Sequence, residues 1–258
     1  MFAHNDLQAR NLTLFAEDLI RLTSKLNFVA DAHLVYNERN SSDRFPQPDL
    51  RPWYSHMSKK YRYFRSQSTT LNQHWTAFNP RIGLIYSPFK GEDVQLFGNL
   101  SRSYEPPTFD ELVGTEVTTN INTSPKRLYA IALDKQTATT LELGSKGRTT
   151  RFSWNVAAYR SWVHNEILEV KDYVRGIKRT ENYPTTLHQG VEVGLNAVVA
   201  DNPWGINAGK LTLGGVYDFS DFRFSGGKYQ GKRLAGIPQH YLNLSAEYEH
   251  SCGLSIAA

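Results

Sequence analysis

The chain has 258 residues, of which 40% are hydrophobic, and its 29 basic and 25 acidic side chains give a formal net charge of +4. This mild charge and the absence of any run of five like charges argue against a nucleic-acid partner. The single cysteine, Cys252, excludes an internal disulfide and a cysteine-based metal site. No stretch approaches the roughly 18 apolar residues of a membrane-spanning helix, but a membrane-spanning strand needs only about 9–11 alternating residues.

Alternation of apolar and polar residues predicts strands along the whole chain, because successive side chains of a strand point to opposite faces. Phe152 and Trp154 alternate with Ser153 in one run, and Leu242 and Leu244 share one side of another. The polar side of each strand should face water, whereas the apolar side could face either a protein core or lipid. The predicted strands are 10–22, 25–38, 60–68, 74–87, 93–104, 137–146, 149–170, 178–199, 208–224 and 239–250.

The connections between these strands alternate in length. Short turns such as SPFKGED and SKGRTT alternate with long polar loops at 40–60, 105–134 and 225–238, and a smaller hairpin tip lies at 171–177 and a compact turn at 201–207. Proline at positions 46, 48 and 52 predicts that no strand pairing continues through the first long loop. With all long loops at one end, the pattern predicts an all-β, antiparallel up-and-down transmembrane β-barrel.

Aromatic residues lie where several predicted strands end. They are Tyr104, Trp162, Tyr183, Phe219 and Tyr241, with Trp204 in a turn at the opposite end. Such positions are typical of the two aromatic girdles of a membrane barrel, although tyrosine also flanks strands in soluble β-proteins. The pattern favours the membrane barrel.

Several phrases of the sequence, in this order, carry a family resemblance. They are FNPRIGLIYSP, LFGNLSRSYEPPTFDEL, TATTLELGSKG, AAYRSWVHNEILEV, ENYPTTLHQGVEVGL and RLAGIPQHYLNLSAEYEH, which together span 78–250. In these phrases the chain resembles the β-barrel of TonB-dependent outer-membrane receptors. Residues 1–77 fit the preceding strands of such a barrel less distinctively.

The resemblance implies a bacterial outer-membrane receptor that binds a scarce nutrient, most often a ferric siderophore or another iron complex. Its partners would be this ligand, the membrane lipid and the TonB complex, which acts through a plug inside the barrel. No enzymatic activity and no cofactor are implied. We expect residues 1–258 to form part of one barrel domain from the C-terminal half of such a receptor, with about ten or eleven strands. We identify no plug, signal peptide or aromatic terminal strand in the sequence.

No catalytic or metal-binding residue is predicted. The acidic cluster Glu105, Asp110, Glu111 and Glu116 could suggest a glycosidase pair, but nothing fixes its spacing, and the resemblance places it at the start of an external loop. The histidines form no HExxH motif, and the sequence has no GxSxG nucleophile elbow and no glycine-rich phosphate loop. His188 and His240 are expected to form hydrogen bonds at strand starts near the barrel rim.

Two residues of the HQGVE phrase have structural predictions. Gly190 is expected to permit a bend or a close approach of strands. Glu192 lies opposite the apolar side of its strand and should point into the barrel lumen, where it could hydrogen bond to a plug.

Basic and aromatic residues of the long loops are the candidates for ligand contact. They are Lys126, Arg127, Tyr129, Lys228, Tyr229, Lys232 and Arg233. These residues could attract an anionic iron chelate, or equally could contact the phosphates of lipopolysaccharide. Both interpretations stay open, so the ligand-binding residues are not assigned.

Two other classes of protein remain possible from the sequence. One is a soluble β-sandwich that binds or hydrolyses carbohydrate, and the other is a non-transporting barrel such as an adhesin or a porin-like channel. A sandwich would bury Phe152, Trp154, Leu242 and Leu244 between two sheets, whereas a membrane barrel would leave them exposed on its convex face.

Overall fold

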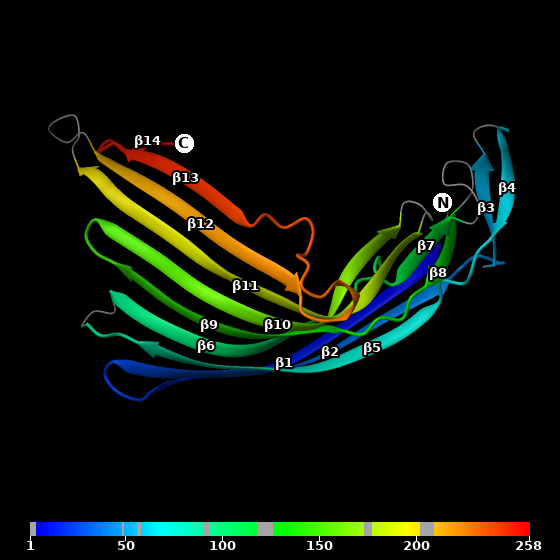
Figure 1. The fold of residues 1–258 in the computed structure, drawn as a ribbon, viewed down its shortest axis with the longest axis horizontal. Helices are drawn as coiled ribbons and strands as arrows, with labels where there is room; N and C mark the ends of the chain where they lie inside the picture. Colours follow the sequence, from blue (N-terminus) through cyan, green and yellow to red (C-terminus); the bar gives the residue numbers. More distant parts are fainter. Residues whose placement is uncertain are drawn as a thin grey trace.

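The computed structural model describes residues 4–47, 49–55, 58–89, 93–117, 126–172, 177–201 and 209–258. Ten of the described strands follow one another in one continuous antiparallel sheet (Figure 1). They are β1 (Asn5–Arg21), β2 (Leu26–Asp43), β5 (Leu71–Tyr86), β6 (Val94–Glu105), β9 (Gln136–Arg148), β10 (Phe152–Asp172), β11 (Ile177–Asp201), β12 (Lys210–Phe224), β13 (His240–Glu249) and β14 (Ser255–Ala257). Every neighbouring pair is antiparallel, so the predicted up-and-down order is confirmed.

Short connections join the strands at one end of the sheet, and long connections join them at the other. The short end carries the turns after β1, β5, β9 and β13, on the left of Figure 1, and the long end carries the β3–β4 and β7–β8 hairpins on the right. The predicted alternation of loop lengths is therefore confirmed. The predicted hairpin tip at 171–177 and turn at 201–207 lie largely outside the described residues.

The long connections contain strands that the sequence interpretation missed. Residues 60–68 were predicted to belong to the main sheet, but β4 (Lys60–Arg65) pairs only with β3 (Leu50–Ser55), in a separate hairpin. Pro52 lies inside this hairpin opposite Tyr63, so the prediction that proline prevents pairing here is wrong. A two-stranded hairpin leaves half of its backbone N–H groups outside the ladder, so proline at such a position costs no hydrogen bond.

The second long connection also folds back onto the sheet. β7 (Val113–Val117) and β8 (Lys126–Ala130) form a hairpin, and Thr115 of β7 pairs with Lys178 of β11. The third long connection contains a 3-10 turn, η1 (Gly227–Tyr229), and forms an isolated antiparallel bridge from Arg233 to Arg223 of β12. Among the described residues, no helix has the length and apolar character needed to cross a membrane.

One face of the main sheet is apolar and exposed to the surroundings. A row of directly paired residues crosses eight strands of this outer face, and its members are Ile20, Phe28, Leu84, Gly98, Leu143, Ala158, Val191 and Phe219. Leu242 and Leu244 are 62% and 71% exposed, and Phe152 is 39% exposed. The main sheet forms a single layer (Figure 1). The soluble β-sandwich interpretation, which requires these side chains to be buried, is therefore wrong.

The apolar band crosses the strands obliquely. One row of the outer face is apolar on β2–β9 and becomes polar on β10–β12, through Ala30, Ile82, Leu100, Leu141, Arg160, Gln189 and Asp221. Another row, nearer the short turns, is formed on β10–β13 by Trp154, Leu195, Gly215 and Leu244. An oblique band is the expected consequence of strands that tilt by about 35–45° from the axis of a membrane barrel.

A small hydrophobic core lies at the long-loop end. Trp75, Leu112 and Leu133 are buried against one another, and Trp75 donates its indole N–H to the carbonyl of Leu133 at 3.1 Å. Trp75 lies on the inner face, the face opposite the apolar band, because it pairs with Asn37 and alternates with the outer-face residue Phe78. The 106–135 connection therefore packs over the inner face of β5.

Candidate functional site

The inner face of the sheet carries charged side chains of both signs. They surround a hollow of about 310 Å³, to which Arg81, Glu142, Lys146 and Glu192 contribute. Within it, the amide of Asn99 donates to the carboxylate of Glu142 at 2.9 Å. The prediction that the position of Glu192 is on the face opposite the apolar band is confirmed, whereas no described contact tests its proposed hydrogen bond to a plug.

Gly190 lies at a close approach of two strands, as predicted. A Cβ atom at this position would lie 2.3 Å from the carbonyl oxygen of Phe219 and 2.7 Å from the hydroxyl of Tyr159. Tyr159 is paired directly with Gly190, so its ring occupies the space above the glycine. A side chain at position 190 would displace either this ring or the backbone of β12.

The two histidines have different environments. His240 begins β13 as predicted, and its Nδ1 lies 2.9 Å from the hydroxyl of Tyr217. His188 lies well inside β11, so the prediction that it stands at a strand start is wrong. Its ring stacks on Phe222 with centroids 4.2 Å apart, and its Nε2 lies 3.3 Å from a carboxylate oxygen of Glu166.

Asn165 explains why Glu166 is buried beside His188. Asn165 has φ 54, in the left-handed region, which changes the alternation of β10 locally. Glu166, which follows, then accepts a hydrogen bond from the hydroxyl of Thr186, a residue that is 1% exposed. This polar cluster fixes the pairing of β10 and β11 below the second long connection.

Among the described acidic residues of the second long connection, Glu111 has a local structural role. The carboxylate of Glu111 accepts hydrogen bonds from the backbone N–H and the hydroxyl of Thr108, at 2.7 and 2.9 Å, and so closes a local turn. Glu105 ends β6, and the side chain of Glu116 lies outside the described residues. Within the described ranges, no group of three or more His, Cys, Asp or Glu residues is placed to hold a metal ion.

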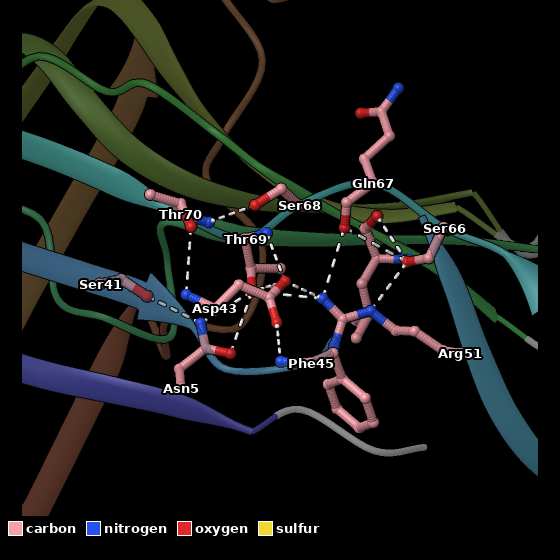
Figure 2. A network of polar contacts seen from close by, with 11 residues as sticks. Asn5, Ser41, Asp43, Phe45, Arg51, Ser66, Gln67, Ser68, Thr69 and Thr70 are labelled. Atoms are coloured by element: carbon pink, nitrogen blue, oxygen red, sulfur yellow. Dashed lines mark hydrogen bonds and ion pairs between the residues drawn. The ribbon is translucent and has the colours of Figure 1, made fainter. Parts of the chain in front are cut away.

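A buried polar network ties the first long connection to the sheet (Figure 2). The guanidinium of Arg51 in β3 forms an ion pair with the carboxylate of Asp43 at the end of β2, and both side chains are almost completely shielded from water. Arg51 also lies over the ring of Phe45, 4.8 Å from its centroid, and donates from Nε to the hydroxyl of Ser66 at 3.2 Å. The sequence interpretation missed this pair because nothing in the local pattern distinguishes Arg51 from other loop arginines.

The pKa of Asp43 is below its ordinary value. Burial by itself raises the pKa. Hydrogen bonds from the backbone N–H groups of Thr69 and Phe45, the charge of Arg51 and the Thr69 hydroxyl lower it, and together they outweigh the effect of burial. These two N–H groups lie 3.0 and 3.2 Å from the carboxylate oxygens. Asp43 is therefore held in its charged form by both ends of the first long connection.

Ser66 links the first long connection to the second. Its hydroxyl donates to the carbonyl of Leu128 in β8, and the backbone N–H of Leu128 donates to the same hydroxyl, both at 3.1 Å. The backbone N–H of Gln67 donates to the carbonyl of Leu128 as well, at 2.9 Å. The β3–β4 hairpin and the β7–β8 hairpin are thus joined through buried hydrogen bonds at the long-loop end.

The third long connection presents aromatic rings and cations together. The rings of Tyr183, Phe224 and Tyr229 lie 4.5–6.0 Å apart between centroids, and the hydroxyl of Tyr183 donates to the carbonyl of Gly226. Lys228 and Lys232 lie over the ring of Tyr229, at 5.3 and 5.8 Å from its centroid. We call these five side chains the aromatic–lysine cluster.

The other predicted ligand contacts are not part of this cluster. Tyr129 packs against Gly114 in the neighbouring strand of the β7–β8 hairpin, Arg127 lies in the same hairpin, and the side chain of Lys126 lies outside the described residues. Arg233 faces the outer side of the sheet, beside Asp221. Of the predicted girdle, Trp162 is exposed on the outer face but lies in the middle of β10 and not at a strand end, which corrects the prediction for this residue. Tyr241 is exposed near the start of β13 but shares the inner face with Asn243, and Trp204 lies outside the described residues.

A family model described as "TonB dependent receptor-like, beta-barrel" matches residues 2–254. The chain belongs to this family. It is accordingly a segment of a bacterial outer-membrane barrel, and the family consists of transporters rather than enzymes. The outer apolar face is therefore the lipid-facing surface, the inner face is the lumenal surface, and the long loops are extracellular.

Solved structures with the same fold include three receptors of low sequence identity. "Copper transporter OprC" superimposes with a TM-score of 0.68 at 12% identity, over 95% of this chain and 34% of that one. The ferric-catecholate import receptor Fiu from K12 E. coli gives 0.65 at 17% identity, over 99% and 34%, and the ferric yersiniabactin uptake receptor FyuA from Yersinia pestis gives 0.62 at 10%, over 95% and 32%.

These structural similarities establish the fold, and they also show how much of a whole receptor the chain corresponds to. The chain spans about a third of the length of these receptors. No protein of curated function matches the chain in sequence.

Proposed function

We propose that this chain forms part of a receptor that takes up a ferric siderophore or another iron complex across the outer membrane, using energy from the TonB complex. The ligand would bind at the extracellular end, and a plug in the lumen would transmit the action of TonB. The receptors with the same fold include two whose names specify ferric siderophore import and one whose name specifies copper. The iron complex is therefore the substrate class that we propose for this chain.

The aromatic–lysine cluster is the observation that carries this proposal. Ferric siderophore complexes are commonly anionic and carry flat aromatic or conjugated groups, so they suit a surface that offers both cations and rings. Lys228 and Lys232 are exposed at the extracellular end, and Tyr229 between them is 39% exposed. Lysine ammonium groups attract an anion at long range, and an aromatic ring contributes contact area at low entropic cost.

Uptake of radioactive iron tests the proposal. Cells whose only siderophore receptor is the full polypeptide containing this chain would be given iron-55 complexes of catecholate and hydroxamate siderophores, with and without a functional TonB complex. We expect TonB-dependent uptake of at least one complex, and about tenfold weaker binding after Lys228→Gln with Lys232→Gln. Lys25→Gln, in the turn between β1 and β2 at the opposite end, is the matched control.

Two results would contradict the proposal. One is uptake of copper but of no iron complex, which would place the chain with the copper transporters. The other is iron uptake that is equal with and without TonB, which would indicate passive diffusion through an open channel.

A further inference from the structure

Two arginines face each other across neighbouring strands of the lipid-facing surface. Arg223 of β12 pairs with Arg233, where the third long connection continues the sheet beyond β13. Like charges directly opposite each other repel, so this arrangement needs a compensating anion. Asp221, two residues before Arg223, supplies part of it: its carboxylate accepts from Nε of Arg223 at 2.8 Å and lies 3.5 Å from Nε of Arg233.

Asp221 holds the two guanidinium groups without neutralising them. The side chain of Asp221 is 12% exposed, whereas those of Arg223 and Arg233 are 46% and 41% exposed. Arg233 also donates from Nη1 to the side-chain oxygen of Gln239 at 2.7 Å, which fixes its direction. The carboxylate is thus at the base of the group, and the two cations face outward with one net positive charge.

A third arginine extends the positive surface along the sheet. Asp221 is paired with Gln189, and Gln189 is paired with Arg160 of β10, so all three lie in one row of the outer face. Arg160 lies over the ring of Trp162, 5.4 Å from its centroid, and both side chains are exposed. Since neighbouring strands are about 4.8 Å apart, the backbone of Arg160 lies roughly 10 Å from that of Asp221, two strands away in the same row.

The position of this arginine cluster, Arg160, Arg223 and Arg233 with Asp221, fixes its depth in the membrane. The next outer-face row toward the short turns contains Ala158, Val191 and Phe219, which begin the apolar band. The arginine cluster therefore stands at the extracellular border of the apolar band, at the level of lipid headgroups, with Trp162 as an interfacial aromatic residue. Three arginines and one aspartate give this surface a net charge of +2.

We propose that the arginine cluster binds the phosphate of a lipid headgroup in the outer leaflet. A guanidinium group binds phosphate through two parallel N–H···O hydrogen bonds. The carboxylate of Asp221, at the base of the cluster, holds the guanidinium groups of Arg223 and Arg233 in place for this contact. The acyl chains of the same lipid would lie on Val191 and Phe219 below. The site is on the outside of the barrel, so it is separate from the proposed transport route through the lumen.

Native mass spectrometry of the full receptor polypeptide in detergent tests this inference. The probes are a synthetic diglucosamine lipid with two phosphates, the same lipid without phosphates, and water-soluble glucosamine 1-phosphate. We expect the phosphorylated lipid to remain bound, and Arg223→Gln with Arg233→Gln to lower its occupancy at least fivefold. The matched control is Arg81→Gln, which removes an arginine of the inner face that lies 3.8 Å from Asp31.

Folding of each variant is checked by its heat-modifiable migration in gels. If the double variant does not fold, Arg160→Gln replaces it, because this side chain is exposed and its removal leaves Asp221 with both of its partners; about a twofold loss of occupancy is expected. Equal occupancy in the variant and the control would overturn the inference, as would equal binding of the lipid without phosphates. Equal binding of glucosamine 1-phosphate would show a general phosphate site rather than a lipid site, and would also overturn it.

Discussion

The guanidinium of Arg51 and the carboxylate of Asp43 form an ion pair whose side chains are 0% and 1% exposed, at the point where the first extracellular connection leaves β2. Two charges without water lose much of their hydration energy, so such a pair is weak evidence for stability in itself. What it supplies is a defined geometry. The carboxylate of Asp43 accepts hydrogen bonds from the backbone N–H groups of Phe45 and Thr69, at the two ends of the connection. Arg51, in turn, donates a hydrogen bond to the hydroxyl of Ser66.

The first prediction concerns Arg51. Arg51→Met keeps an unbranched side chain but leaves Asp43 without its cation, and removal of one partner of a buried ion pair costs roughly 3–5 kcal/mol. We expect the 44–70 connection to open locally while the main sheet stays folded. Hydrogen exchange measured by mass spectrometry should show faster exchange in 44–70, and also in β8, because Ser66 is hydrogen bonded to Leu128.

The matched control for Arg51 is Arg65→Met, in the partner strand of the same hairpin, where the side chain is exposed. It removes the same charge from the same hairpin but should leave exchange almost unchanged. Faster exchange in 44–70 alone, with β8 unaffected, would contradict the mechanical link between the two connections.

The second prediction is a pH dependence. The pKa of Asp43 in the folded protein lies below its unfolded value of about 3.9, so the charged carboxylate stabilises the network fully above that value. This stabilisation is lost as the pH falls through the lower, folded pKa. We expect proteolysis of the 44–70 connection by pepsin to accelerate below about pH 4, and Asp43→Asn to show fast cleavage already at the upper end of the range in which pepsin is active. Parallel acid profiles for the two proteins would contradict this assignment.

The third prediction uses two glycines of β11 as a pair. A methyl group at Gly190 would lie 2.3 Å from the carbonyl of Phe219, whereas at Gly194 the nearest atom would lie 3.8 Å away, at the carbonyl of Asn155. Gly190→Ala should therefore force β11 and β12 apart and lower the temperature at which the folded barrel loses its heat-modifiable migration. Gly194→Ala should leave that temperature within a few degrees of the parent. Equal effects of the two substitutions would contradict the close approach at Gly190.

The strand faces of the main sheet could be predicted from the sequence, because lipid and water on opposite sides require strict alternation. Leu242 and Leu244, or Phe152 and Trp154, reveal their face without any knowledge of their neighbours. The order of strands followed from loop lengths in the same way. Both inferences use only local pattern, and both are confirmed.

The extracellular structure could not be predicted, because its contacts join residues that are distant in sequence. Arg51 and Asp43 are both unremarkable in a polar loop, and the burial that distinguishes them arises only when the β3–β4 hairpin folds over β2. Likewise, Asp221 is one of many acidic residues until β12 and the third connection bring Arg223 and Arg233 to it. The local sequence pattern therefore predicts the strands of the barrel wall, whereas the surfaces formed by the loops depend on contacts between residues distant in sequence.

The fourth prediction concerns Trp75, which anchors the second extracellular connection. Trp75→Phe removes the hydrogen bond to the carbonyl of Leu133 and part of the contact with Leu112, which should cost about 1 kcal/mol for the hydrogen bond and more for the lost volume. Hydrogen exchange in 126–135 should increase. Trp162→Phe, on the exposed outer face, is the control and should leave this segment unchanged.

The last prediction tests the assignment of the two faces. Leu244 is 71% exposed on the outer face of β13, and its neighbour Asn243 points to the opposite face. Arginine on the lipid-facing side near the middle of a barrel strand costs roughly 2–4 kcal/mol, whereas arginine in a wet lumen costs little. We therefore expect Leu244→Arg to lower the amount of folded receptor in the outer membrane sharply and Asn243→Arg to leave it nearly unchanged. Urea titration of the refolded barrel in lipid vesicles measures the difference, and a larger loss for Asn243→Arg would reverse the assignment of lipid and lumen on every strand that is in register with β13.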